Sequence, residues 1–130
     1  YSKNIENSIY EAIQIEFKDN GEYIIESLVG RIYYDNKNFN KCLKQERTIL
    51  TELKNLFAEN AKYKDYGMQS HEADPSGKSK GSWHTFKLND GSGWIYLECM
   101  NWTEETGHYD NLRITILGSE FGKWLRTEGY

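Results

Sequence analysis

The sequence has little proline and cysteine, no basic excess and no long apolar run. It contains 1 proline and 2 cysteines among 130 residues. No stretch approaches the roughly 18 consecutive apolar residues that a membrane-spanning helix needs, so we expect no membrane span. The 16 Lys and Arg against 20 Asp and Glu give a net charge of −4. This balance argues against nucleic acid as a partner, because phosphate binding depends on a basic surface.

The common catalytic and cofactor motifs are also missing. Gly77-Lys78-Ser79 matches the end of a phosphate-binding loop, but the glycine required five positions earlier is replaced by Glu72. There is no GxSxG nucleophile elbow. Acidic residues and His108 gather in residues 103–111, but no spacing there marks a general acid or base. We therefore predict a non-catalytic protein without a cofactor.

One segment could supply metal ligands. His71, Glu72 and Asp74 lie within four residues of one another, and His84 and His108 could join them from the ends of strands. The spacing matches no zinc or calcium signature. We predict no metal site, and a metal-assisted hydrolase is kept as the third hypothesis for function.

Aromatic residues are what the sequence has in excess: 4 Trp, 10 Tyr and 5 Phe. A chain this rich in aromatics is not a disordered one. Its length suits one domain. We therefore predict a single α+β domain over residues 1–130.

The first half is predicted to be mainly helical, because its apolar residues recur at helical spacing. The clearest helix covers about residues 38–61 and carries Cys42 on its apolar stripe. Two shorter helices are predicted before it, over residues 5–17 and 25–33. A β-hairpin is an open alternative for residues 10–33, because Asn20-Gly21 is a strong hairpin turn.

The second half is predicted to be a loop, a three-stranded antiparallel β-meander and a short C-terminal helix. The loop covers residues 63–81, and the strands cover residues 82–88, 93–102 and 112–117. A turn at Asp90-Gly91 pairs Phe86 with Ile95. The longer link to the third strand permits Cys99 to lie opposite Ile114. Ser119 is expected to cap the final helix.

Alternation along these strands separates two faces of the predicted sheet. One face is apolar, includes Cys99 and is expected to pack against the helices. Because Cys42 lies on the apolar stripe of the long helix, we predict a Cys42–Cys99 disulfide, which implies an oxidising compartment. The opposite face is mixed and aromatic.

The aromatic face is the predicted binding site. Its candidate binding residues are Trp83, Trp94, Tyr96, Glu98, Trp102 and Arg113. Trp and Tyr beside charged groups are typical of protein interfaces. The same rings could stack on sugars, so a carbohydrate-binding module is the second hypothesis. A second small core under a covering helix is the structural alternative.

The predicted function is a small exported protein-binding domain. Since the sequence begins at Tyr1 and not at Met, we expect a processed chain whose signal peptide has been removed, located in the periplasm or secreted. A bacterial inhibitor or toxin-immunity protein is the most concrete form of this hypothesis. The acidic net charge favours a basic partner.

Overall fold

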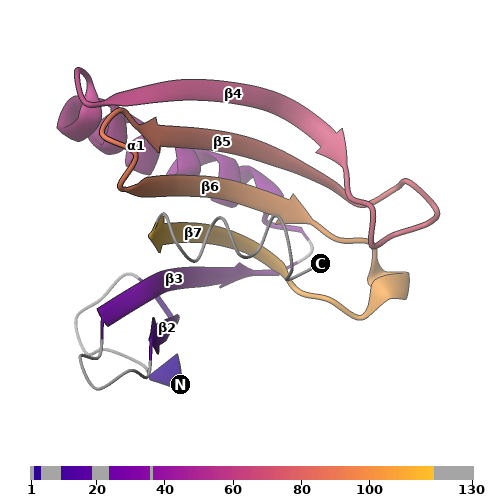
Figure 1. The fold of residues 1–130 in the computed structure, drawn as a ribbon. Coiled ribbons are helices and arrows are strands. Elements are labelled where there is room, and N and C mark those ends of the chain that lie inside the picture. The colour runs from indigo at the N-terminus through magenta and orange to yellow at the C-terminus, as the bar shows by residue number, and fades with distance from the viewer. Residues whose placement is uncertain (1, 4–9, 19–23, 36, 119–130) are drawn as a thin grey trace.

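The protein is built on one antiparallel sheet with a helix behind it (Figure 1). The computed structural model describes residues 2–3, 10–18, 24–35 and 37–118. Within them, seven strands lie in the order β1-β2-β3-β7-β6-β5-β4. In chain order the elements are β1 (Ser2–Lys3), β2 (Ala12–Lys18), β3 (Ile24–Tyr34), α1 (Phe39–Phe57), β4 (Ala61–Ser70), β5 (Lys80–Leu88), β6 (Gly93–Asn101), the 3-10 helix η1 (Glu104–Thr106) and β7 (Asp110–Gly118).

The prediction of a mainly helical first half is wrong. β2 and β3 form an antiparallel pair in which Ala12 lies opposite Arg31 and Lys18 lies opposite Ile24. The hairpin alternative therefore agrees with the structure, although its turn at residues 19–23 lies outside the described residues. β3 is apolar on both faces, since Ile32 packs on the helix-side core while Val29 is buried on the other side. Apolar residues on both faces of a strand can imitate helical spacing.

The predicted loop over residues 63–81 is wrong in its first part. β4 runs from Ala61 to Ser70 and pairs with β5 along its length. All of β4 after Ala61 is exposed, so this edge strand has no apolar alternation that a pattern search could find. A bulge lies between Asp65 and Gly67, and Gly67 has a φ of +67°.

The predicted α+β fold with a three-stranded meander is wrong, because the protein is mostly β and β5, β6 and β7 are only three strands of the larger sheet. The pairing of Phe86 with Ile95 is confirmed. The β6–β7 register differs by two residues, because Cys99 lies opposite Leu112 and not Ile114. A slip of two residues leaves every side chain on its predicted face. The predicted C-terminal helix from Ser119 lies outside the described residues.

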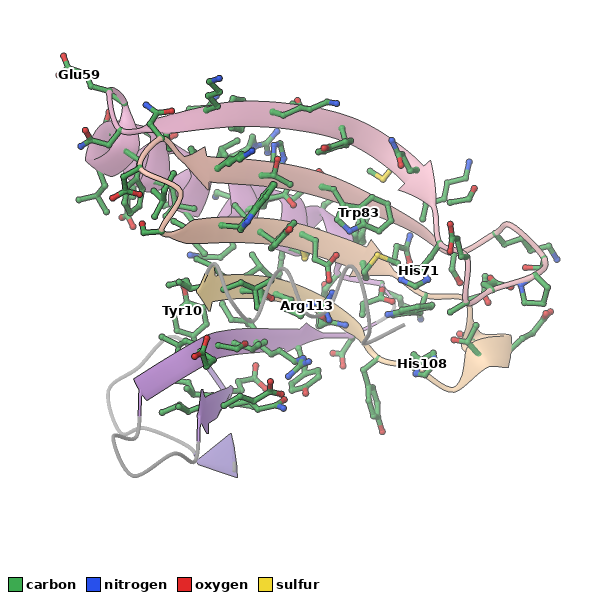
Figure 2. The ribbon with its side chains drawn as sticks, in the orientation of Figure 1. Tyr10, Glu59, His71, Trp83, His108 and Arg113 are labelled. Carbon is green, nitrogen blue, oxygen red and sulfur yellow. A yellow bond between two sulfur atoms is a disulfide. The ribbon has the colours of Figure 1, made fainter. Side chains whose placement is uncertain are left out.

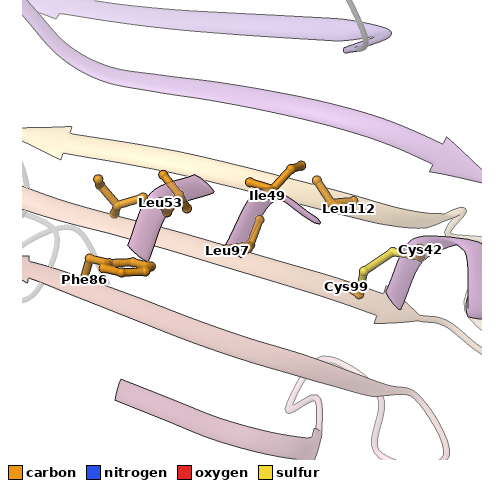
Figure 3. Packing of buried hydrophobic residues seen from close by; sticks show 8 residues of the cluster. Cys42, Ile49, Leu53, Phe86, Leu97, Cys99 and Leu112 are labelled. Carbon is orange, nitrogen blue, oxygen red and sulfur yellow. A yellow bond between two sulfur atoms is a disulfide. The ribbon is translucent and has the colours of Figure 1, made fainter. Parts of the chain in front are cut away.

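Helix α1 covers one face of the sheet and closes the apolar core (Figure 3). Ile49 and Leu53 of the helix pack against a cluster that includes Phe86, Leu97 and Leu112. Across the described residues, no helix is long and apolar enough to span a membrane.

The predicted disulfide between the helix and the sheet is confirmed. Cys42 of α1 is bonded to Cys99 of β6, with their Cα atoms 6.0 Å apart, within the usual range for a disulfide. Both cysteines are fully buried. The bond ties the start of α1 to the central part of the sheet.

Candidate functional site

The face of the sheet turned away from α1, called the outer face here, carries the predicted binding residues. Trp83 and Arg113 lie on this side in Figure 2, with the helix behind the sheet. The strand register aligns four side chains in one row across β5, β6, β7 and β3. The row consists of Trp83, Glu98, Arg113 and Arg31.

Glu98 is the centre of this row. One carboxylate oxygen is paired with the Arg113 guanidinium, and the other accepts a hydrogen bond from the Trp83 indole N–H. Glu98 is only 5% exposed, and a buried carboxylate is stable only when it is paired and hydrogen-bonded. Both oxygens of Glu98 are therefore engaged within the row.

The outer face is hollowed where β6 ends and β7 begins. The pocket there has a volume of about 430 Å³. Arg31, Glu98 and Arg113 line it, and three aromatic residues contribute to its walls, namely Tyr33, Trp102 and Tyr109. The rings of Tyr33 and Tyr109 meet edge to face, with centroids 6.5 Å apart. Charged groups and aromatic rings thus line one cavity of ligand-binding size.

Two histidines flank Trp102 at the rim of this pocket. The Trp102 ring centroid lies 4.7 Å from that of His71 and 4.6 Å from that of His108, and both imidazoles line the pocket. His71 directly follows β4, whereas His108 follows η1, so two connecting segments meet over one indole ring. Figure 2 shows both histidines at this end of the sheet.

Asp74 fixes the segment that carries His71. Its Oδ1 accepts hydrogen bonds from the Ser76 amide at 2.9 Å and the Ser76 hydroxyl at 2.7 Å. Its Oδ2 accepts from the Ser79 amide at 2.9 Å, the Ser79 hydroxyl at 2.6 Å and the Thr103 hydroxyl at 3.3 Å. Hydrogen bonds from the Ser76 and Ser79 side chains hold the pKa of Asp74 well below its ordinary value. The network joins the β4–β5 loop to the segment after β6.

The candidate metal ligands do not converge. The Asp74 oxygens are occupied by this loop network, and His84 lies on the helix side of the sheet, away from His71 and His108. In the described part of the chain, no three His, Cys, Asp or Glu residues are grouped so that they could hold a metal ion. The hypothesis of a metal-assisted hydrolase therefore gains no support from these residues.

His84 instead belongs to a buried polar cluster between α1 and the sheet. Glu46 Oε1 accepts a hydrogen bond from the Ser82 hydroxyl at 2.8 Å and lies 3.2 Å from His84 Nε2. His84 Nδ1 lies 2.7 Å from the Tyr63 hydroxyl. Through its two ring nitrogens, His84 thus links Glu46 of α1 to Tyr63 of the edge strand β4.

This cluster contains serine, histidine and glutamate, but it is not arranged for nucleophilic catalysis. Glu46, Ser82 and His84 are all buried, and the Ser82 hydroxyl already donates to the carboxylate. A catalytic triad needs an accessible serine whose proton passes to the histidine. The cluster is therefore a structural contact between α1 and β5.

The six predicted binding residues divide into two groups. Glu98, Trp102 and Arg113 line the pocket, and Trp83 is joined to it through Glu98. Trp94 and Tyr96 do not line the pocket; their rings stack on each other at 6.3 Å, with planes 5° apart. The predicted binding residues do not include the other eight lining residues, among them Arg31, Tyr33 and Tyr109. Arg31 and Tyr33 lie in the predicted helix over residues 25–33, so the sequence could not place them beside β7.

Comparison of the chain with known protein families, with curated proteins and with solved structures found no match. The pocket's own residues therefore carry the functional proposal.

Proposed function

We propose that this chain is a small, non-catalytic, exported binding domain that holds a partner protein on its outer face. The observation that carries this proposal is the pocket of about 430 Å³. It combines charged side chains with Tyr33, Trp102 and Tyr109, which are residue types that concentrate binding energy at protein interfaces. Export to an oxidising compartment is supported by the disulfide.

The most concrete form of the proposal is a bacterial inhibitor or toxin-immunity protein. The small size of the chain supports it, and the net charge of −4 would attract a basic partner at long range. The gene next to the one encoding this chain tests this form. We expect a secreted toxin or enzyme there, and an unrelated neighbour would count against it.

Selection from a random-peptide display library tests the general proposal. The full chain with its disulfide intact is the bait, and the affinity of each selected peptide is measured by calorimetry. Tyr109→Ala should weaken pocket-bound peptides by about tenfold, because aromatic anchors contribute on the order of 1–2 kcal/mol or more. Tyr109 is 74% exposed, so its truncation should leave the fold intact.

Tyr66→Ala is the matched control. Tyr66 is an exposed tyrosine on β4 and does not line the pocket. The proposal is wrong if no peptide is selected, or if the selected peptides bind both variants as tightly as the unaltered chain. Quenching of tryptophan fluorescence by oligosaccharides, lost in Trp102→Ala, would favour the carbohydrate-binding alternative instead.

A further inference from the structure

The pocket contains more positive than negative charge. Two arginines, Arg31 and Arg113, and one carboxylate, Glu98, line it. Arg31 and Arg113 are direct partners across β3 and β7, and like charges placed directly opposite on a sheet repel each other. Because Glu98 is paired with Arg113, Arg31 has no ion-pair partner among the described residues that line the pocket.

Within the described part of the chain, most guanidinium donors of Arg31 have no partner. Among the described residues, the one hydrogen bond of its side chain runs from Nη1 to the neutral Gln14 Oε1, at 3.4 Å. Gln14 Nε2 in turn donates to Glu16 Oε1 at 3.1 Å, and no ion pair joins the described residues Glu16 and Arg31. A guanidinium carries five N–H donors in a planar fork that matches a carboxylate.

We propose that the pocket binds a carboxylate, with Arg31 as its principal ligand and the neighbouring rings against the carbon atoms that bear the acid. This rests on the proposed function, in which the carboxylate is an acidic side chain of the partner protein. Trp102, Tyr33 and Tyr109 line the same cavity as Arg31, so an acidic group next to an apolar one fits the site best.

The charge count favours a carboxylate over a phosphate. The three charged side chains leave one uncompensated positive charge, which matches a single negative charge. A phosphate monoester carries between one and two negative charges at neutral pH and is held in proteins by clusters of arginines. The overall acidity of the chain does not oppose the proposal, because net charge acts at long range while Arg31 acts on one group in contact.

Three small probes that share a phenyl ring test this assignment: phenylacetate, neutral phenylacetamide and phenyl phosphate. They are titrated at constant ionic strength while the Nε–H signals of the arginine side chains are followed by NMR. Phenylacetate should shift the Arg31 signal with saturation and leave the exposed helix residue Arg47 unchanged. Phenylacetamide should bind at least tenfold more weakly, because a hydrogen bond to a charged group contributes about 1.5–3 kcal/mol.

Two substitutions of Arg31 sharpen the test. Arg31→Gln should abolish saturable phenylacetate binding. Arg31→Lys should retain weakened binding, because lysine keeps the charge but not the planar fork. Arg47→Gln removes the same charge from α1 and should have no effect.

Three results would overturn the inference: no saturable shift with phenylacetate, equal binding of phenylacetamide, or tighter binding of phenyl phosphate. Failure of the inference differs from failure of the proposed function. If the selected peptides bind Tyr109→Ala more weakly but bind Arg31→Gln as tightly as the unaltered chain, the proposal of a binding domain holds and the carboxylate site is wrong. If the selected peptides bind both variants as tightly as the unaltered chain, the proposed function is wrong.

Discussion

The two faces of the sheet use their polar residues in opposite ways. On the helix side, Ser82 and His84 both contact Glu46 Oε1 in the buried interior, where Glu46 Oε2 has no hydrogen-bond partner among the described residues. On the outer face, Glu98 is paired with Trp83 and Arg113, but Arg31 lies opposite another arginine and, among the described residues, keeps donors without a partner. Polar groups that are buried under the helix cannot reach a ligand, whereas a donor that lines the pocket can bind one.

This contrast predicts a separation of effects. Substitutions on the helix side should lower the free energy of unfolding, while substitution of an exposed pocket residue such as Tyr109 should lower affinity and leave stability nearly unchanged. The loop network around Asp74 belongs to neither face, since it joins the β4–β5 loop to the segment after β6. Three measurements test the contrast, from the largest effect to the smallest.

Removing the disulfide should have the largest effect. The double substitution Cys42→Ala and Cys99→Ala opens a loop with a sequence separation of 57 residues, and should lower the free energy of unfolding by about 4 kcal/mol. Urea unfolding at neutral pH measures it. Tyr109→Ala in the pocket is the comparison and should change stability by less than about 0.5 kcal/mol. A similar decrease in the free energy of unfolding in both variants would contradict the predicted difference between the two faces.

Breaking the buried polar cluster should have an intermediate effect. His84→Leu removes one donor to Glu46 and leaves the Tyr63 hydroxyl without its acceptor, at a cost of about 2 kcal/mol. Tyr63→Phe removes only the hydroxyl and should cost about 1 kcal/mol. The double variant should cost less than the sum of the single ones, because both remove the same contact. Strict additivity would show that Tyr63 and His84 are not coupled.

The smallest effects concern two aspartates whose pKa values shift in opposite directions. Hydrogen bonds lower the pKa of Asp74 from 3.8, so its ionised form stabilises the fold above about pH 4, and this contribution is lost as the pH falls below 3.8. Burial raises the pKa of Asp110 from 3.8, so its ionised form is penalised at neutral pH, and the penalty is relieved as the pH falls through the raised pKa.

Two asparagine variants separate these contributions in urea titrations between neutral pH and about pH 2. Asp74→Asn should be less stable than the unaltered chain at pH 7, and the gap should close on acidification below 3.8. Asp110→Asn keeps an oxygen for the Trp102 amide and should be at least as stable at pH 7, with any advantage shrinking on mild acidification. Parallel pH profiles for the two variants would contradict both assignments.

The parts of the fold that could be predicted from sequence depended on local chemistry. Asp90-Gly91 set the β5–β6 register, and strict alternation placed Cys99 on the face that meets α1. Glu98 and Arg113 were assigned to one face for the same reason. These predictions required only a period of two and one turn.

The parts that could not be predicted depended on long-range pairing. β3 joins β7, which lies more than 70 positions later in the chain, as in the pairing of Ile32 with Leu112. No local pattern encodes that partner, and the spacing of the apolar residues on both faces of β3 predicts a helix instead. The predicted set of binding residues was incomplete for the same reason. Arg31 and Tyr33 lie at the pocket only because β3 pairs with β7.

The bulge in β4 has a consequence for the behaviour of the chain among its own copies. β4 is a ten-residue edge strand, and such an edge can template the addition of a foreign strand. The bulge at Asp65 and Gly67 breaks the regular ladder, and Lys62 and Lys64 add exposed charge to the same strand. A second strand laid along β4 could follow only part of its length before its hydrogen bonds lost register. Within the described sheet, the irregularity thus makes this edge a poorer template for fibre growth.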